Sequence, residues 1–350
     1  MAKYPIAGVR VESFGPFRQV DVPLAPSLTV IVGDNATGKS QLLKLMYACT
    51  KCLKDADSLT KKELNGGIAA KLRGVFRPES LGRLTRRSRG KTIASISVKY
   101  EGIAEPLAFD FSSHATREVK IATVPSRRLE DEPVFIPSHE LFSLTSSFLG
   151  LYNEYETGFE ETWKDTVELL LQRPALRGPR GEQANKMLEP FSSLLQGGSV
   201  VESKGNLYLK QPGIGSLEAP LLAEGQRKLA MIVRLISNGA LLKGGYLFWD
   251  EPEANLNPAS QRAVAQALIL LAEGGAQIVV ATHSMFLVRE LQMIPSEVQP
   301  KYISLARKSD TGESSAMDEV GAQTSDDVDD LEVIASLDAE VEQADRYLAW

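Results

Sequence analysis

Apolar and polar positions in the first fifty residues form distinct successive patterns. Residues 6–12 and 17–24 alternate as the two strands of a hairpin do, and a Gly-Pro pair lies between them. Residues 28–32 form a short, mostly apolar run, which favours a buried strand. From 41 to 53 the apolar residues recur at helical spacing. The N-terminal part is therefore predicted to be a hairpin, a buried strand and a helix.

Similar patterns continue to about residue 306. Several short strands are predicted between 91 and 136, and mainly helices from about 141 to 196. The later part is predicted to hold a hairpin at 200–210, helices at 225–243 and 258–272, and strands at 246–250 and 277–281. Strands that alternate with helices indicate an α/β fold with a parallel sheet.

The last forty residues follow a different pattern. Residues 308–325 are rich in Ser, Thr, Gly and Asp, so we expect a flexible acidic linker. Residues 326–350 are expected to form a C-terminal acidic amphipathic helix. Its apolar stripe would be Leu331, Ile334, Val341 and Leu348. Such a helix either docks on its own body or binds a partner, and the pattern leaves both readings open.

The sequence GDNATGKS at 33–40 matches G-x-x-x-x-G-K-[ST] and stands between the predicted strand and helix. Glycines let backbone N–H groups approach a phosphate closely, and a helix N-terminus favours an anion. A lysine can then contact the β- and γ-phosphates, and a hydroxyl can contact Mg²⁺. We therefore expect ATP, as substrate, to bind at Gly33, Asp34, Asn35, Ala36, Thr37, Gly38, Lys39, Ser40 and Gln41.

Two later strands end in polar residues. One ends at Asp250, which is expected to bind Mg²⁺ together with Ser40. Glu251 follows directly and is expected to activate the attacking water as a general base. The other strand ends at Thr-His-Ser, where His283 either contacts the γ-phosphate or the water, or is only structural. The predicted catalytic residues are Glu251, His283 and Lys39.

A fourth motif, Leu222-Ala223-Glu224-Gly225-Gln226, opens a predicted helix. The order of these four motifs resembles that of ABC ATPases, over roughly 1–55 and 205–306. The resemblance implies an ABC-ATPase head over 1–307, with a P-loop core sheet, an antiparallel β subdomain and a helical lid insertion at about 139–198. It also implies a homodimer with composite ATP sites, or a larger assembly. In it, the signature residues Ala223, Gly225 and Gln226 contact the ATP bound by the opposite subunit.

The chain departs from that family pattern in two places. Ala223 replaces the usual serine, so one hydroxyl contact to the γ-phosphate is missing, and Glu224 replaces a glycine. The resemblance also implies a glutamine in the lid loop, and none is evident there. One of Ser138, His139 and Glu140 is the candidate to replace it.

The opening of the chain resembles the RecF and chromosome-maintenance branch of this superfamily. Only 67 residues follow His283, so no fused Toprim nuclease is expected. The resemblance is closest to stand-alone bacterial ATPases of the AAA-labelled, ABC-like type. It implies a regulatory ATPase that works beside an effector protein encoded nearby, in anti-phage defence or a toxin–antitoxin-like module. The alternative is a RecF-like ATPase of DNA repair or maintenance that acts directly on DNA.

Charge leaves that choice open. Residues 310–350 hold 13 acidic residues and one basic residue, whereas the first 309 hold 32 acidic and 38 basic. The stretch 71–91 has eight basic residues and one acidic residue. It could contact a DNA backbone, form a solvated loop or clamp the acidic tail.

Composition narrows the class of protein. The 350 residues are 43% hydrophobic and 24% charged, as in ordinary globular proteins, and no apolar run approaches the roughly 18 residues of a membrane helix. The N-terminus shows no secretory pattern, so we expect a cytoplasmic protein without membrane association. Cys49 and Cys52 have C-x-x-C spacing but no second pair, so packing in a helix is expected rather than a metal site.

Overall fold

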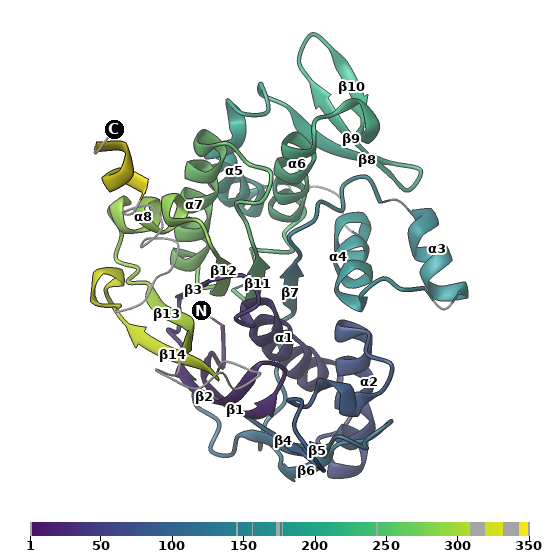
Figure 1. Ribbon diagram of the computed structural model, residues 1–350. Coiled ribbons are helices and arrows are strands. Elements are labelled where there is room, and N and C mark those ends of the chain that lie inside the picture. The colour runs from purple at the N-terminus through teal and green to yellow at the C-terminus, as the bar shows by residue number, and fades with distance from the viewer. Residues whose placement is uncertain are drawn as a thin grey trace.

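The computed structural model describes residues 2–144, 146–155, 157–172, 176, 178–242, 244–308, 319–331 and 343–348. Its centre is a six-stranded sheet in the order β14-β13-β3-β12-β11-β7 (Figure 1). The strands are β3 (Leu28–Gly33), β7 (Pro133–Ile136), β11 (Tyr246–Asp250), β12 (Gln277–Thr282), β13 (Lys301–Lys308) and β14 (Glu319–Ser325). All pairs are parallel except β13 with β14.

Helices cover both faces of this sheet, which explains the continuous apolar runs of its strands. Successive residues of β11 point to opposite faces and enter two separate cores. Leu247 and Trp249 pack in the core with α6 (Glu224–Ser237) and α7 (Pro258–Glu273). Tyr246 and Phe248 pack in the core with α1 (Lys39–Asp55) and α2 (Lys61–Phe76). The central strands are thereby buried on both sides.

A five-stranded antiparallel sheet in the order β2-β1-β4-β5-β6 packs on the α1–α2 side. Its strands are β1 (Ile6–Phe14), β2 (Phe17–Pro23), β4 (Ile93–Tyr100), β5 (Leu107–Ser112) and β6 (Lys120–Thr123). Apolar residues of β1 and β2 alternate into the core, as the sequence predicted. A smaller antiparallel sheet of β8 (Ser199–Ser203), β9 (Asn206–Gln211) and β10 (Gly215–Glu218) projects near the start of α6 (Figure 1).

The helical insertion consists of α3 (Ser146–Glu154), α4 (Glu161–Gln172) and α5 (Pro179–Ser192). Ion pairs and a hydrogen bond join the start of α4 to helices α2 and α1. The Lys71 ammonium of α2 lies 2.8 Å from Glu161 Oε1 and 2.7 Å from Asp165 Oδ2. Tyr47 of α1 donates a hydrogen bond to the same Asp165 oxygen. The predicted α/β fold class, with a parallel core sheet, an antiparallel subdomain and a helical insertion, is confirmed.

The tail requires a correction. Residues 319–325, which we expected in a flexible linker, form β14 because they pair with the free edge of β13 from Tyr302–Ser325 to Lys308–Glu319. Val328–Asp330 is a 3-10 turn, and Val328 and Leu331 are buried in the core of α6 and α7. Within the expected helix, residues 343–348 are described as helical, and their side chains are exposed. Ile334 and Val341 lie outside the described residues.

Two smaller differences concern helices. Helix α2 was not predicted, and it takes up the first part of the basic stretch 71–91. Helix α6 ends at Ser237 rather than 243. Helix α8 (Met285–Met293) and the 3-10 turns η1 (Leu81–Leu84), η2 (Ala219–Leu221) and η3 (Val328–Asp330) complete the described elements. In the described part of the chain, no helix combines the length and hydrophobicity needed to span a bilayer.

Candidate functional site

The carboxyl ends of β3, β12 and β11 lie side by side at one edge of the central sheet. Because the three strands are parallel neighbours, the segments that follow them converge there, as ligand sites do in open α/β sheets. β3 leads into residues 33–40, β11 ends at Asp250, and β12 ends at Thr282. The fold thus brings together three motifs that are up to 250 residues apart in sequence.

The loop after β3 needs its two glycines. Gly33 has a φ of 152°, and an added Cβ would lie 2.3 Å from Leu305 O. Gly38 has a φ of 94°, in the left-handed region, and an added Cβ would lie 2.5 Å from the Phe17 ring. A side chain at either position would force the backbone to move. Close backbone approach and the N-terminus of α1 together make this loop a suitable cradle for phosphate.

Lys39 is buried and lies across the loop that precedes it. Its Nζ donates to Gly33 O at 2.7 Å and to Asp34 O at 2.8 Å. Thr37 Oγ1 also donates to Asp34 O. Burial lowers the pKa of Lys39, while neighbouring carboxylates act in the opposite direction. The other expected loop residues, Asn35, Ala36 and Gln41, are exposed at the same edge.

Ser40 and Asp250 are in direct contact, although 210 residues separate them. Ser40 Oγ donates to Asp250 Oδ1 at 2.9 Å, and Asp250 is only 7% exposed. Burial raises the pKa of Asp250 to about 6, although the hydrogen bond from Ser40 acts in the opposite direction. A hydroxyl and a carboxylate are hard oxygen ligands, which Mg²⁺ prefers beside nucleotide phosphates. These two residues therefore fit the magnesium ion expected from the sequence.

Glu251 and His283 also meet at this edge. His283 Nδ1 lies 3.6 Å from Glu251 Oε1, and half of the His283 side chain is exposed. Glu251 has a φ of 46°, a left-handed conformation that is uncommon for a residue with a side chain. Strain of this kind costs on the order of 1 to 3 kcal/mol and is concentrated at functional sites.

Glu253 belongs to the site but was not identified from the sequence. It is 5% exposed, and its Oε1 accepts hydrogen bonds from Thr282 Oγ1 at 2.7 Å and from the His283 backbone N–H at 3.0 Å. His283 Nδ1 lies 3.4 Å from the same oxygen. Glu253 therefore connects the loop after β11 to the turn after β12. The available signal was a second carboxylate two residues beyond Glu251, next to a strand end.

The N-terminus of α6 holds the signature-like residues. Gln226 Oε1 accepts from the Ala223 backbone N–H, so that side chain satisfies a free donor of the helix start. An added Cβ at Gly225 would lie 2.8 Å from Asn255 O, so Gly225 permits close packing on the loop after β11. Glu224 does not stand free, since its Oε1 accepts from Asn255 Nδ2 at 2.7 Å. Ala223 and Glu224 are exposed.

The three lid candidates have partners away from the phosphate loop. Glu140 Oε1 forms an ion pair with Arg227 Nε at 2.6 Å, directly after the signature. The His139 ring lies 5.5 Å from the Trp163 ring. Ser138 O accepts a hydrogen bond from Lys228. The structure therefore joins Ser138 and Glu140 to α6 and His139 to α4, and none of the three is placed at the phosphate loop by these contacts.

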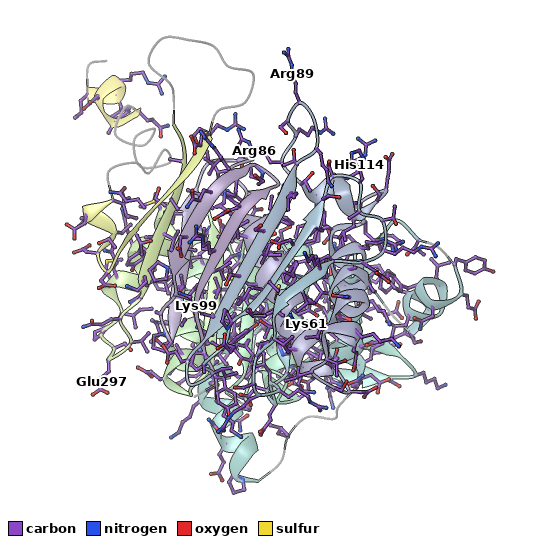
Figure 2. All side chains as sticks on the ribbon, turned by 90° about the horizontal axis from the view of Figure 1, so that it is seen from below. Lys61, Arg86, Arg89, Lys99, His114 and Glu297 are labelled. Carbon is purple, nitrogen blue, oxygen red and sulfur yellow. The ribbon has the colours of Figure 1, made fainter. Side chains whose placement is uncertain are left out.

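The basic stretch 71–91 is divided between different environments. Lys71 is held by Glu161 and Asp165, and Arg86 Nη1 donates to Pro16 O at 2.9 Å. Arg87, Arg89 and Lys91 are exposed. Figure 2 shows Arg89 at the tip of a loop that projects beyond the five-stranded sheet. Arg73, Arg77 and Arg83 are exposed as well, so the stretch keeps basic surface along its length, and its last bases lie on the projecting loop.

The two cysteines lie in α1, as expected for packing. Cys49 is buried, and burial raises the pKa of the Cys52 thiol to about 12. Among the described residues, no group of three or more His, Cys, Asp or Glu side chains is arranged to hold a metal ion.

Solved structures share this fold. An Smc head bound to the C-winged helix domain of ScpA matches with a TM-score of 0.56 and 13% identity, over 92% of this chain and 97% of that chain. An Smc head domain with an extended coiled coil, bound to the C-terminal domain of ScpA derived from Pyrococcus furiosus, matches with a TM-score of 0.55 and 11% identity, over 98% and 100%. At these identities the likeness shows the fold alone.

Sequence comparison adds the family. No curated protein matches the chain. Residues 28–289 match the family described as "AAA domain, putative AbiEii toxin, Type IV TA system". The match begins at β3 and ends beyond His283, so it includes all the motifs that meet at the sheet edge. The chain therefore belongs to this family of AAA ATPases, and it shares the fold of the Smc heads.

Proposed function

We propose that this protein hydrolyses ATP in a Mg²⁺-dependent reaction at the edge formed by β3, β11 and β12. The observation that carries the proposal is the 2.9 Å contact between Ser40 of the phosphate loop and the buried Asp250. Two motifs that each predicted half of a magnesium site are joined by that hydrogen bond. Glu251 follows Asp250 at the same edge, where a general base is required.

Each residue has a part in the proposed reaction. The loop from Gly33 to Gly38 and the N-terminus of α1 bind the phosphates, and Lys39 exchanges its bonds to loop carbonyls for the β- and γ-phosphates. Ser40 and Asp250 would hold Mg²⁺, which neutralises charge that develops on the phosphates. Glu251 accepts a proton from the attacking water, and His283 beside it orients that water or the γ-phosphate.

We further propose that two copies close around ATP. The support is the exposed N-terminus of α6, where Ala223 and Glu224 are accessible to a second chain. The site at the sheet edge already has the residues for hydrolysis, so α6 is available to contact the γ-phosphate of the partner's ATP. Because Glu224 is held by Asn255, its carboxylate is directed toward its own chain, which reduces repulsion of the phosphate.

Calorimetry and light scattering test these proposals together. The Glu251→Gln variant should bind Mg²⁺–ATP and form a dimer, so that its mass by light scattering doubles. With ADP it should remain a monomer. The matched control is Glu251→Gln combined with Lys39→Ala, which should remain monomeric in ATP. ATP binding without any change of mass would contradict the dimer and leave the ATP site standing.

The biological role that we propose is control of an effector protein encoded nearby, in defence or a toxin–antitoxin-like module. Support comes from the family description, which names a toxin of a Type IV system. The acidic segment beyond Leu331 is the proposed contact, since the catalytic motifs are complete before it. Val328 and Leu331 are part of the core, so the truncation that tests this should follow Leu331.

That truncation should leave ATP hydrolysis within about twofold of the full chain, because no residue of the proposed site is removed. It should abolish co-purification with the neighbouring gene product. In the matched control, Asp338 is replaced by Ser and Glu340 and Glu342 by Gln, so that the chain length is kept. Unchanged co-purification after truncation would exclude the tail as the contact.

Direct action on DNA is the second candidate, and the exposed loop with Arg87, Arg89 and Lys91 favours it (Figure 2). Backbone phosphates would be its ligand. Neutralising these three residues should remove DNA-stimulated hydrolysis if DNA binds there. The matched control neutralises Lys62, Lys99 and Lys120, which are also exposed. Equal loss in both variants would show a general effect of net charge.

A further inference from the structure

Lys228 is a buried base on α6, five residues beyond Ala223, that has no part in the reaction as proposed so far. It is 1% exposed. Its ammonium donates to three backbone carbonyls, Ser138 O at 3.0 Å, Glu251 O at 2.8 Å and Ala254 O at 3.2 Å. A lysine ammonium has three donors, so all of them are used here. Burying such a group is costly, and burial lowers its pKa to about 8.

The three acceptors belong to segments with different roles. Ser138 follows β7 and opens the segment that leads into the helical insertion. Glu251 is the proposed general base, and Ala254 lies in the loop after it. Lys228 itself belongs to the helix whose N-terminus carries the signature. The Lys228 side chain therefore connects three parts: the helix that carries the signature-like residues, the segment that leads into the helical insertion, and the turn that holds Glu251.

The contact with Glu251 involves the strained part of its backbone. With a φ of 46°, Glu251 is in a left-handed conformation. Its N–H donates to Ala281 O at 2.8 Å, and its carbonyl accepts from Lys228. The peptide groups on both sides of its Cα are therefore held. Since the backbone direction at Cα sets where the side chain points, these two bonds orient the Glu251 carboxylate.

We propose that Lys228 is a positioning residue for hydrolysis, which holds the Glu251 turn in its left-handed conformation and links it to α6. This inference rests on the proposed function.

The first test compares Lys228→Met with Arg234→Met. Arg234 is a buried base on the same helix, but its Nε donates to Leu170 O, in the helical insertion. Lys228→Met should lower kcat by roughly tenfold or more and leave the Kd for ATP within about twofold, the pattern of an interaction needed only for the chemical step. Arg234→Met should keep kcat. An unchanged kcat in Lys228→Met would overturn the proposal.

A double-mutant cycle with Glu251→Gln supplies the readout that a purely structural role would not give. If Lys228 acts through Glu251, Lys228→Met should change the residual rate of Glu251→Gln by less than about twofold. The same loss in both backgrounds would overturn the inference. Failure of the proposed function looks different, because the wild-type protein would then hydrolyse no ATP.

Lys228→Arg answers the question if Lys228→Met does not fold. It keeps the positive charge and donors, but its planar fork cannot reproduce three bonds from one compact ammonium. We expect normal ATP binding with a reduced kcat. A normal kcat in Lys228→Arg would show that three bonds from one compact ammonium are not needed, and positioning by Lys228 would be rejected.

Discussion

The phosphate loop and the start of α6 are both helix N-termini with a part in the proposed function, but they are held in different ways. Apart from the bond from Ser40 to Asp250, the side-chain bonds in the loop are local, since Lys39 and Thr37 donate to Gly33 O and Asp34 O within six residues. Bonds at the start of α6 join distant segments. Arg227 pairs with Glu140, 87 residues away, and Lys228 reaches Ser138, 90 residues away.

The two kinds of bonding determine whether each helix start can move independently of its neighbouring segments. A loop held by its own residues keeps its form when neighbouring segments move, which suits a binding element. The start of α6 is bonded to the segment that leads into the helical insertion and to the turn that holds Glu251, so it cannot move without affecting both. On the proposed function, the first region would serve binding and the second would position groups for hydrolysis. The following predictions separate these two tasks.

Lys39→Ala should have the largest effect, because its ammonium is the main side-chain countercharge to the β- and γ-phosphates. ATP binding should be lost entirely in calorimetry, while the thermal stability should stay near that of the wild type. Lys54→Ala, at the far end of the same helix, is the control and should bind normally. Full affinity in Lys39→Ala would refute the site assignment.

Glu251→Gln should slow the hydrolysis step and leave the affinity for ATP unchanged. Loss of a general base slows hydrolysis by roughly 10²- to 10⁴-fold, and the near-isosteric amide keeps the neighbouring Asp250 in place. Steady-state turnover and ATP calorimetry measure the two quantities. A normal rate would mean that another residue activates the water, and His283, 3.6 Å away, would be tested next.

Binding of Mg²⁺ should weaken in acid because burial raises the pKa of Asp250 to about 6. Below that pH the carboxyl is protonated and neutral in the free protein, so a proton must leave before the metal binds. Apparent Mg²⁺ affinity in ATP should then fall by about tenfold per pH unit below about pH 6. Asp250→Asn corrects for the titration of ATP itself. An identical pH dependence in the two proteins would contradict this prediction.

Glu253→Ala should have the smallest effect on rate and a clear effect on stability. Its loss leaves the buried Thr282 hydroxyl and the His283 N–H without their acceptor, so the free energy of unfolding should fall by about 1–3 kcal/mol. Urea unfolding measures it, and kcat should fall by several-fold because His283 loses its support. Glu253→Gln keeps an acceptor oxygen and should restore most of the stability. No difference between the two variants would show that the hydrogen bonds are unimportant.

The sequence by itself determined the parts that depend on local patterns. Apolar runs predicted the buried strands, and glycine, lysine and serine at fixed spacing predicted the phosphate loop. A polar residue directly after an apolar strand predicted Asp250 and Glu251. Such features can be read from the chain because the residues concerned are neighbours in sequence, and the geometry follows from the strand or turn that they form.

Tertiary structure alone decided how distant segments meet. Glu253 supports His283, and Lys228 reaches Glu251, through contacts that no spacing in the sequence encodes. The same holds for β14, which has little apolar character but pairs with the edge of β13. Lys71 was one of eight bases in a charged stretch until α4 placed two carboxylates beside it. In each case the partner comes from far along the chain, so the environment that gives the residue its role exists only after folding.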